Sequence, residues 1–302
     1  MNKFKDKLYQ YRVLVVIVCL IIIAGCGYSL YASFNNDKQS YVTHVSDGDK
    51  EVVKDDSVTV TKDDIYYYLL DNNGLNLTLN TAIEYVASQE VKDEDAINNK
   101  IEEIKQQYLQ YASGKDLNTY AKEVGYDSEE ALVKEVIKPN AKLQLLQEQY
   151  ANKNFSKLVK SYKVKYLKYF TVDTESQALK IIKNIKDEAS YTNYFNEYSG
   201  SDAGIVTTKS TSVDENIVKK LSKFTKDGIY SKAIKTSDSK YAVIWVYNSN
   251  VNNVKDEIKE ELMSLTDFTT KCETYYLKKY QFDVYEPVIK EKIKETSEDY
   301  FE

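Results

Sequence analysis

The side chains that most often carry out acid and base chemistry are scarce in this chain. It has one histidine, His44, and three cysteines, Cys19, Cys26 and Cys272. General acid and base catalysis most often uses histidine, and the polar segment around His44 predicts no fixed neighbours for it. A Ser-His-Asp hydrolase and a Cys-His enzyme are therefore excluded. We expect no metal and no cofactor, because no paired Cys/His spacing exists and the carboxylates are scattered along predicted helix faces.

Cys26 is the residue for which the sequence predicts a covalent modification. A basic start precedes an apolar run from Val13 to Ala24, which ends in Gly25-Cys26. This order is typical of an export signal. The segment Ile23-Ala24-Gly25-Cys26 resembles a bacterial lipobox, in which the cysteine thiol is acylated and anchors the protein. We expect residues 1–26 to be a signal peptide with a lipid on Cys26; the alternative is an uncleaved spanning helix, because apolar residues continue to Phe34.

Charge and composition indicate an exported globular protein. Lys+Arg total 41 against Asp+Glu 47, and the signs are mixed along the chain, so nucleic acid is not expected as a partner. Cys272 has no cysteine left to pair with in the folded part. Residues 27–56 are polar and poor in apolar side chains, which predicts a flexible tether.

Residues 57–161 are predicted to be nearly all helix. Thr61 and Asp64 have the spacing of a reciprocal helix cap, and Asn72-Asn73-Gly74 predicts the end of that helix. Pro139 lies inside a later helical pattern and predicts a kink or division there. An amphipathic stripe that must pack against another helix recurs at steps of three and four, at Ile97, Ile101, Ile104, Tyr108 and Tyr111.

From Val164 the pattern changes to strand formers. Strands are predicted near residues 164–170, 229–235 and 241–247, with helices between the first two. A further apolar stripe from Ile258 to Tyr276 follows, and we expect it to meet the stripe on residues 97–111.

This order resembles the parvulin peptidyl-prolyl isomerase domain. The matching segments are Asn196-Glu197-Tyr198-Ser199, Asp202-Ala203-Gly204, Lys226-Asp227-Gly228-Ile229-Tyr230-Ser231 and the closing hairpin. Residues 254–262 look like the helix that follows this domain in PrsA-type foldase lipoproteins, and residues 60–64 resemble the start of their SurA-like N-terminal segment.

The resemblance implies an α+β fold with a mostly helical chaperone module. Residues 57–161 and C-terminal helices over residues 249–302 would pack together to form this module. A parvulin-like domain of residues 162–248, a small antiparallel sheet flanked by helices, would be inserted between them.

The resemblance also points to site residues and to a departure from the family. The two cleft histidines of parvulins correspond most nearly to Lys168 and to the region of Ala242. Asp202 corresponds either to the acidic or cysteine position of the family or to the Asp of its later Asp-Leu-Gly motif. Residues 211–217 lack the methionine and phenylalanine that hold a prolyl ring in the family. We therefore expect a degenerate isomerase site at Lys168 and Asp202, and an enzyme assignment stays open.

The interpretation that joins these features is a membrane-anchored, extracytoplasmic foldase or chaperone for secreted proteins. Its partners would be unfolded or partly folded chains, with a homodimer left open, and its acidic net charge would weakly favour basic clients. The alternatives are an active isomerase with an atypical cleft and a non-catalytic surface interaction protein. Tyrosines offer an apolar ring and a hydroxyl for binding clients, and the candidates are Tyr66, Tyr67, Tyr108, Tyr111, Tyr275 and Tyr276.

Overall fold

The computed structural model describes residues 42–55, 58–112 and 114–296. They form two compact units. Residues 87–275 make up one unit, and the described residues up to Val86 together with those from Tyr276 onward make up the other. The predicted α+β class is confirmed, because helices dominate and the main sheet is small and antiparallel. In this division the sheet belongs to the same unit as the helices that precede it.

The first of these units along the chain begins with a hairpin that leads directly into a long helix. Strand β1 (Glu51–Lys54) pairs antiparallel with β2 (Thr59–Thr61), and α2 runs over Lys62–Glu90. The predicted cap is confirmed. The amide of Thr61 donates to Asp64 Oδ2 at 2.8 Å, and the amide of Asp64 donates to Thr61 Oγ1 at 3.2 Å. These bonds satisfy amides that the start of a helix leaves without partners.

The predicted break at Asn72-Asn73-Gly74 is wrong, because α2 continues through it. Gly74 is buried, and a Cβ there would lie 3.1 Å from Leu70 Cδ1 and 3.2 Å from Ile289 Cδ1. Ile289 belongs to α12 (Pro287–Thr296). The missing side chain thus allows α12 to approach α2 closely, and this packing outweighs the poor helix propensity of glycine.

The described part of the predicted tether is fixed to the rest of its unit. Thr43 donates its amide and its hydroxyl to Glu286 Oε2, at 3.0 and 2.6 Å, and the amide of Val42 donates to the same oxygen at 3.3 Å. Residues 51–54 are held by pairing with β2. The expectation of a flexible tether is therefore wrong for residues 42–55, because hydrogen bonds hold a segment whose apolar content is too low to do so. The remainder, residues 27–41 and 56, lies outside the described residues.

Helices form the first part of the second unit. Asp93 caps α3, because its side chain accepts from the amides of Asp95 and Ala96. Later in the unit, a π-helical turn over Val133–Ile137 interrupts the α-helical hydrogen bonding, and a new α-helix begins at Lys138, one residue before Pro139. The predicted division of the helix near Pro139 is confirmed. The elements in order are α3 (Glu94–Tyr111), α4 (Leu117–Glu123), α5 (Glu129–Leu132), the π turn (Val133–Ile137) and α6 (Lys138–Tyr162).

The five-stranded sheet follows α6 and is antiparallel throughout. The strand order is β4-β3-β7-β5, and β6 also pairs with β7. Strand β4 was not predicted, because its small and polar residues have weak strand propensity. Its strand conformation is stabilised by hydrogen bonding to β3. The strands are β3 (Lys165–Val172), β4 (Ser201–Val206), β5 (Gly228–Ile229), β6 (Ile234–Lys235) and β7 (Tyr241–Tyr247).

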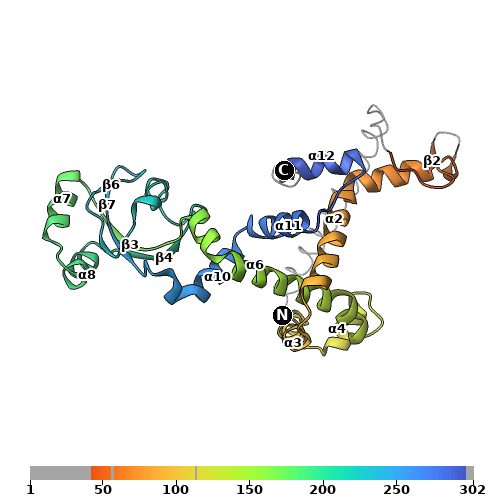
Figure 1. Cartoon of the computed structure of the whole chain (residues 1–302), viewed down its shortest axis with the longest axis horizontal. Coiled ribbons are helices and arrows are strands. Elements are labelled where there is room, and N and C mark those ends of the chain that lie inside the picture. Colours follow the sequence, from red (N-terminus) through yellow and green to blue (C-terminus); the bar gives the residue numbers. More distant parts are fainter. Residues whose placement is uncertain (1–41, 56–57, 113, 297–302) are drawn as a thin grey trace, which may run out of the picture. The chain divides into compact units, whose positions relative to one another are not determined.

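Each face of the sheet has its own apolar core. One face packs against α7 (Glu175–Asn184) and α8 (Glu188–Glu197), which lie beside the strands in Figure 1. Phe170, Val172 and Val243 point to this face. The other face carries Leu167, Ala242 and Ile244 and is covered by the segment that includes α9 (Glu215–Val218) and a 3-10 turn at Leu221–Lys223.

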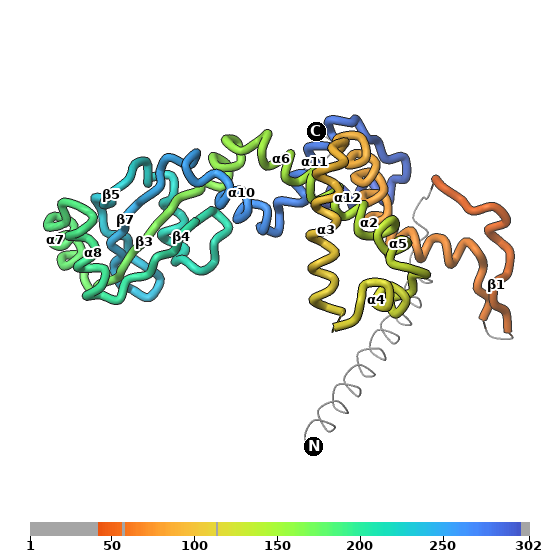
Figure 2. Tube along the Cα trace, turned by 90° about the horizontal axis from the view of Figure 1, so that it is seen from below, coloured from red at the N-terminus to blue at the C-terminus, as the bar shows by residue number. Residues whose placement is uncertain are grey.

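After the sheet the chain returns to α6. A 3-10 turn (Val251–Val254) leads into α10 (Lys255–Ser264), which packs along α6, as Figure 2 also shows, and then α11 (Phe268–Lys279) begins. Ile258 and Leu262 of α10 are fully buried, and the rings of Phe268 and Tyr150 lie 5.6 Å apart. The apolar stripe from Ile258 to Tyr276 was expected to pack against residues 97–111. The structure places α10 against α6, and α6 also packs against α3.

Candidate functional site

Lys168 and Asp202 lie opposite each other on the paired strands β3 and β4. A third residue, Tyr247 of β7, connects them. Its hydroxyl donates to Asp202 Oδ1 at 2.6 Å, and its ring centroid lies 5.2 Å from Lys168 Nζ. Lys168 Nζ also lies 2.8 Å from Glu188 Oε1 at the start of α8. The structure therefore brings the two sequence-predicted residues together, with partners that the sequence analysis did not name.

The protonation of this cluster suits it to holding the strands together. Burial raises the pKa of Tyr247 well above its usual value of 10, and the hydrogen bond to Asp202 raises it further. The phenol thus stays protonated and donates. Asp202 also accepts from the amide of Gly204 at 3.0 Å. Both of these donors lie on Asp202 Oδ1, and Lys168 faces Glu188, so the cluster connects β3, β4, β7 and the start of α8.

The two positions that the resemblance equates with cleft histidines lie on opposite faces of the sheet. Lys168 shares its face with Tyr247 and the start of α8, whereas Ala242 is buried in the cluster on the other face. Side chains alternate along a strand, and it is Tyr169 that packs against the Ala242 cluster. Tyr169 was not predicted as a site residue. The alternation from Leu167 was the signal that could have identified it.

Tyr169 lines a hollow of about 720 Å³ on that face. Three acidic residues, Asp214, Glu215 and Asp238, line it. Asp214 accepts from the amide of Ser237 at 2.8 Å, from the Ser237 hydroxyl and from the amide of Asn216 at 2.9 Å. Burial alone would raise the pKa of Asp214, but the bonds from Ser237 and Asn216 outweigh it and lower the pKa. Burial, and then the charge of Asp214, raises the pKa of Tyr169.

The rest of this lining mixes polar and apolar groups. Val213 and Ile217, from the segment where the family carries its apolar residues, are buried in the core. Val213 and Val218 also line the hollow, together with the hydroxyl residues Thr171, Thr208, Ser210, Thr211, Ser212, Thr236 and Ser237. Twisting an X-Pro bond over its barrier of about 18–20 kcal/mol calls for a desolvated apolar slot. This hollow places carboxylates and hydroxyls beside two valines, which fits poorly with that task.

Two of the six candidate tyrosines lie near the C-terminus, and the structure separates their roles. Tyr276 is only 2% exposed, so its proposed contact with clients is wrong: the ring belongs to the core. Tyr275 is partly exposed and its ring lies 5.2 Å from that of Tyr150. Of this pair, only Tyr275 remains accessible to a client.

Tyr66 and Tyr67 stand at the start of α2 and hold the segment before β1. Tyr66 donates its hydroxyl to Thr43 Oγ1 at 2.9 Å, and the hydroxyl of Tyr67 lies 2.7 Å from His44 Nδ1. His44 therefore has fixed neighbours, contrary to the expectation from its polar surroundings. Both rings remain partly exposed.

Tyr108 and Tyr111 lie in the last turn of α3. The ring of Tyr108 meets that of Tyr120 on α4 edge to face, with centroids 5.9 Å apart. Tyr111 is 77% exposed, so the predicted stripe is buried at Ile97, Ile101 and Ile104 and ends in solvent. We refer to Tyr108, Tyr111 and Tyr120 as the α3–α4 aromatic surface.

Other predicted features concern the membrane and metals. Cys26 and the rest of the predicted signal lie outside the described residues. Within residues 42–296, as far as they are described, no helix has the length and apolar character to cross a bilayer. The same residues contain no cluster of three His, Cys, Asp or Glu side chains arranged to hold a metal ion.

Comparison with known proteins returns the group that the sequence pattern resembles. No protein-family model and no curated protein matches the chain. Among solved structures it is similar to the peptidylprolyl isomerase PrsA of Bacillus cereus, at 18% identity and a TM-score of 0.46 over 83% of this chain and 100% of that one. It is also similar to the foldase PrsA of Streptococcus pneumoniae, at 14% identity and a TM-score of 0.33 over 80% of this chain and 98% of that one.

A third match is a structure described as one of two SurA-like chaperones, PEB4 and Cj1289, of Campylobacter jejuni. The identity is 15% and the TM-score 0.24, over 77% of this chain and 96% of that one. The predicted resemblance to PrsA-type and SurA-like proteins is thus confirmed as a resemblance.

Proposed function

We propose that this protein is an extracytoplasmic foldase of the PrsA type that binds unfolded secreted chains. One observation carries the proposal: the helices before and after the sheet pack together, α10 against α6, with the sheet inserted between them in the sequence. This is the architecture that the sequence resemblance implies. We keep residues 57–161 and 249–302 as its chaperone module and residues 162–248 as the parvulin-like insert.

Binding, without bond chemistry, is the mechanism that the side chains support. The sole histidine, His44, is hydrogen-bonded to Tyr67 outside the five-stranded sheet. The two acidic candidates at the sheet already accept hydrogen bonds, two on Asp202 and three on Asp214. An exposed ring offers apolar surface to a client at low conformational cost. The α3–α4 aromatic surface is the candidate that the structure leaves most accessible, through Tyr111.

Anchoring is the second part of the proposal. The basic start, the apolar run and Cys26 are the features of a lipidated export signal. A lipid on Cys26 would hold the foldase at the outer face of the membrane, where secreted chains emerge unfolded. Radiolabelled fatty acid should be incorporated into the full chain in cells and lost on Cys26→Ser, and labelling that survives this change would exclude the anchor.

The binding function is tested by following the aggregation of a reduced, unfolded client with increasing amounts of the full chain. Suppression is expected at stoichiometric amounts, because bound chains no longer meet one another. Tyr111→Ser should raise the amount needed for half suppression. Tyr285→Ser is the matched control, since Tyr285 is 82% exposed but lies outside the α3–α4 aromatic surface. No suppression at any ratio would refute the foldase.

A further inference from the structure

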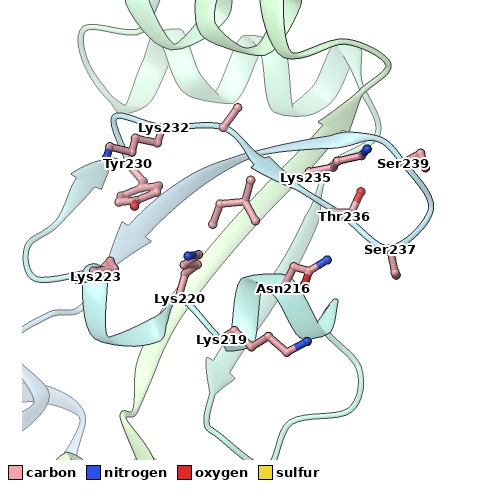
Figure 3. Close-up of a pocket in the computed structure, with 12 residues that line it drawn as sticks. Asn216, Lys219, Lys220, Lys223, Tyr230, Lys232, Lys235, Thr236, Ser237 and Ser239 are labelled. Atoms are coloured by element: carbon pink, nitrogen blue, oxygen red, sulfur yellow. The ribbon is translucent and has the colours of Figure 1, made fainter.

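A second hollow on the sheet-bearing part of the chain is lined by lysines. Its volume is about 900 Å³, and five lysines line it, as Figure 3 shows. Each of the five side chains is exposed. They come from the segment around α9, from the 3-10 turn that follows and from the stretch between β5 and β7, and they are Lys219, Lys220, Lys223, Lys232 and Lys235.

Most of this positive charge is not neutralised within the described residues. Lys219 lies 2.8 Å from Glu215, whereas the structure gives the other four lysines no carboxylate partner within ion-pair distance. Residues 219–240 contain seven lysines and two aspartates, in a chain whose net charge is −6. The hollow is therefore positively charged although the protein as a whole is negatively charged. A cleft lined by charges of one sign concentrates ligands of the opposite sign.

The floor of the hollow is apolar. Tyr230 is partly buried and its ring packs edge to face on Phe224, with centroids 4.9 Å apart. Ala233 and Ile234 lie beside it, and Ile234 is 6% exposed. A basic rim above an aromatic and aliphatic floor suits a ligand that carries both carboxylates and apolar side chains. An acidic polypeptide segment has both, whereas a phosphodiester polymer has no apolar group for the floor.

We propose that this basic hollow binds acidic segments of client polypeptides. The lysine ammonium groups pair with Asp and Glu side chains, and an apolar or aromatic client residue rests against Tyr230. The inference rests on the proposed foldase function and names a class of client for it. It also reverses the preference for basic clients that the net charge suggests, because the contact surface and not the total charge decides which chains bind.

The test is a fluorescence anisotropy titration of the full chain in a non-ionic detergent. The probe is a labelled peptide of Glu and Tyr in a Gly/Ser background, and its control has every Glu replaced by Gln. The triple variant K220E/K223E/K232E should weaken binding of the Glu peptide by about tenfold or more, since each change removes an attraction and adds a repulsion. Binding of the unaltered chain should also weaken as salt rises from about 0.05 to about 0.5 M.

The matched control is K180E/K183E, which reverses two exposed lysines of α7 outside the hollow. It should bind the Glu peptide as the unaltered chain does, and far-UV circular dichroism should show that both variants keep the fold. Equal affinity of the triple variant and this control would overturn the proposal. So would equal binding of the Glu and Gln peptides, or selective binding of poly(glycerol phosphate) or phosphatidylglycerol vesicles in place of the peptide.

These outcomes are separate from failure of the foldase function. If the chain suppresses aggregation of its clients but the triple variant binds the Glu peptide normally, the foldase stands and the hollow has no role in it. If the Glu peptide binds at the hollow but no client is protected from aggregation, the binding site stands and the foldase function is refuted.

Discussion

Single polar residues tie the end of α6 to the start of α11. Tyr162 donates its hydroxyl to Asp267 Oδ1 at 2.9 Å, and Lys271 Nζ lies 3.0 Å from the other oxygen and 4.0 Å from the Tyr162 ring centroid. Burial alone would raise the pKa of Asp267, but the bonds from Lys271 and Tyr162 outweigh it and lower the pKa. The carboxylate is charged at neutral pH and stabilises the fold in that form.

Tyr162→Phe removes one donor from this carboxylate. We expect a loss of about 1.5–3 kcal/mol in the free energy of unfolding at neutral pH, the range for hydrogen bonds to charged groups. A carboxylate whose pKa is lowered by folding stabilises the protein above its unfolded pKa of about 3.9, and this contribution disappears as the pH falls through the folded value. Urea unfolding at neutral and at acidic pH should show a smaller loss in acid. An equal loss of unfolding free energy at both pH values would mean that the Tyr162 hydroxyl does not stabilise the protein through the Asp267 carboxylate.

At the residue scale, the sequence identified Lys168 and Asp202 but not the face of the sheet to which each side chain points. Lys168 and Asp202 lie opposite each other as paired residues, but Lys168 and Ala242 point to opposite faces, and Tyr169 takes the face of Ala242. A shift of one residue in a strand exchanges its faces. The alternation of side chains from Leu167 could have indicated this choice, but only once the start of the strand was known.

At the scale of elements, the sequence predicts helices and strands wherever local signals agree with packing. The cap at Thr61 and the division before Pro139 depend on neighbouring residues, and both were predicted. The continuation of α2 through Gly74 depends on Ile289, more than 200 positions away. Strand β4 depends in the same way on β3. Contacts distant in sequence therefore account for the errors.

The contact between α10 and α6 should contribute strongly to stability. Leu262 of α10 is 0% exposed, and Leu262→Ala should cost about 2–5 kcal/mol through lost burial and the cavity that remains. Leu179→Ala on α7 is the control, because Leu179 is 37% exposed. Thermal unfolding of both variants gives the comparison. A loss no greater for Leu262→Ala than for the control would contradict the packing of the returning helix.

For the whole molecule, the architecture and the charge distribution support the proposed binding function. The sequence supplied the fold class, the family resemblance and the shortage of histidine. It did not reveal the basic hollow, because mixed charges along the chain conceal how lysines 13 residues apart, such as Lys219 and Lys232, gather around one space. That arrangement is a property of the fold.

The most direct measurement follows X-Pro isomerisation of a proline peptide and aggregation of a reduced, unfolded client in one preparation of the full chain. Our account predicts that aggregation is suppressed while the exchange proceeds at its uncatalysed rate, because carboxylates and hydroxyls line the hollow beside Tyr169 and Asp214 already accepts three hydrogen bonds. Accelerated exchange that Tyr169→Phe abolishes would contradict it, since it would place a working isomerase site on that face of the sheet.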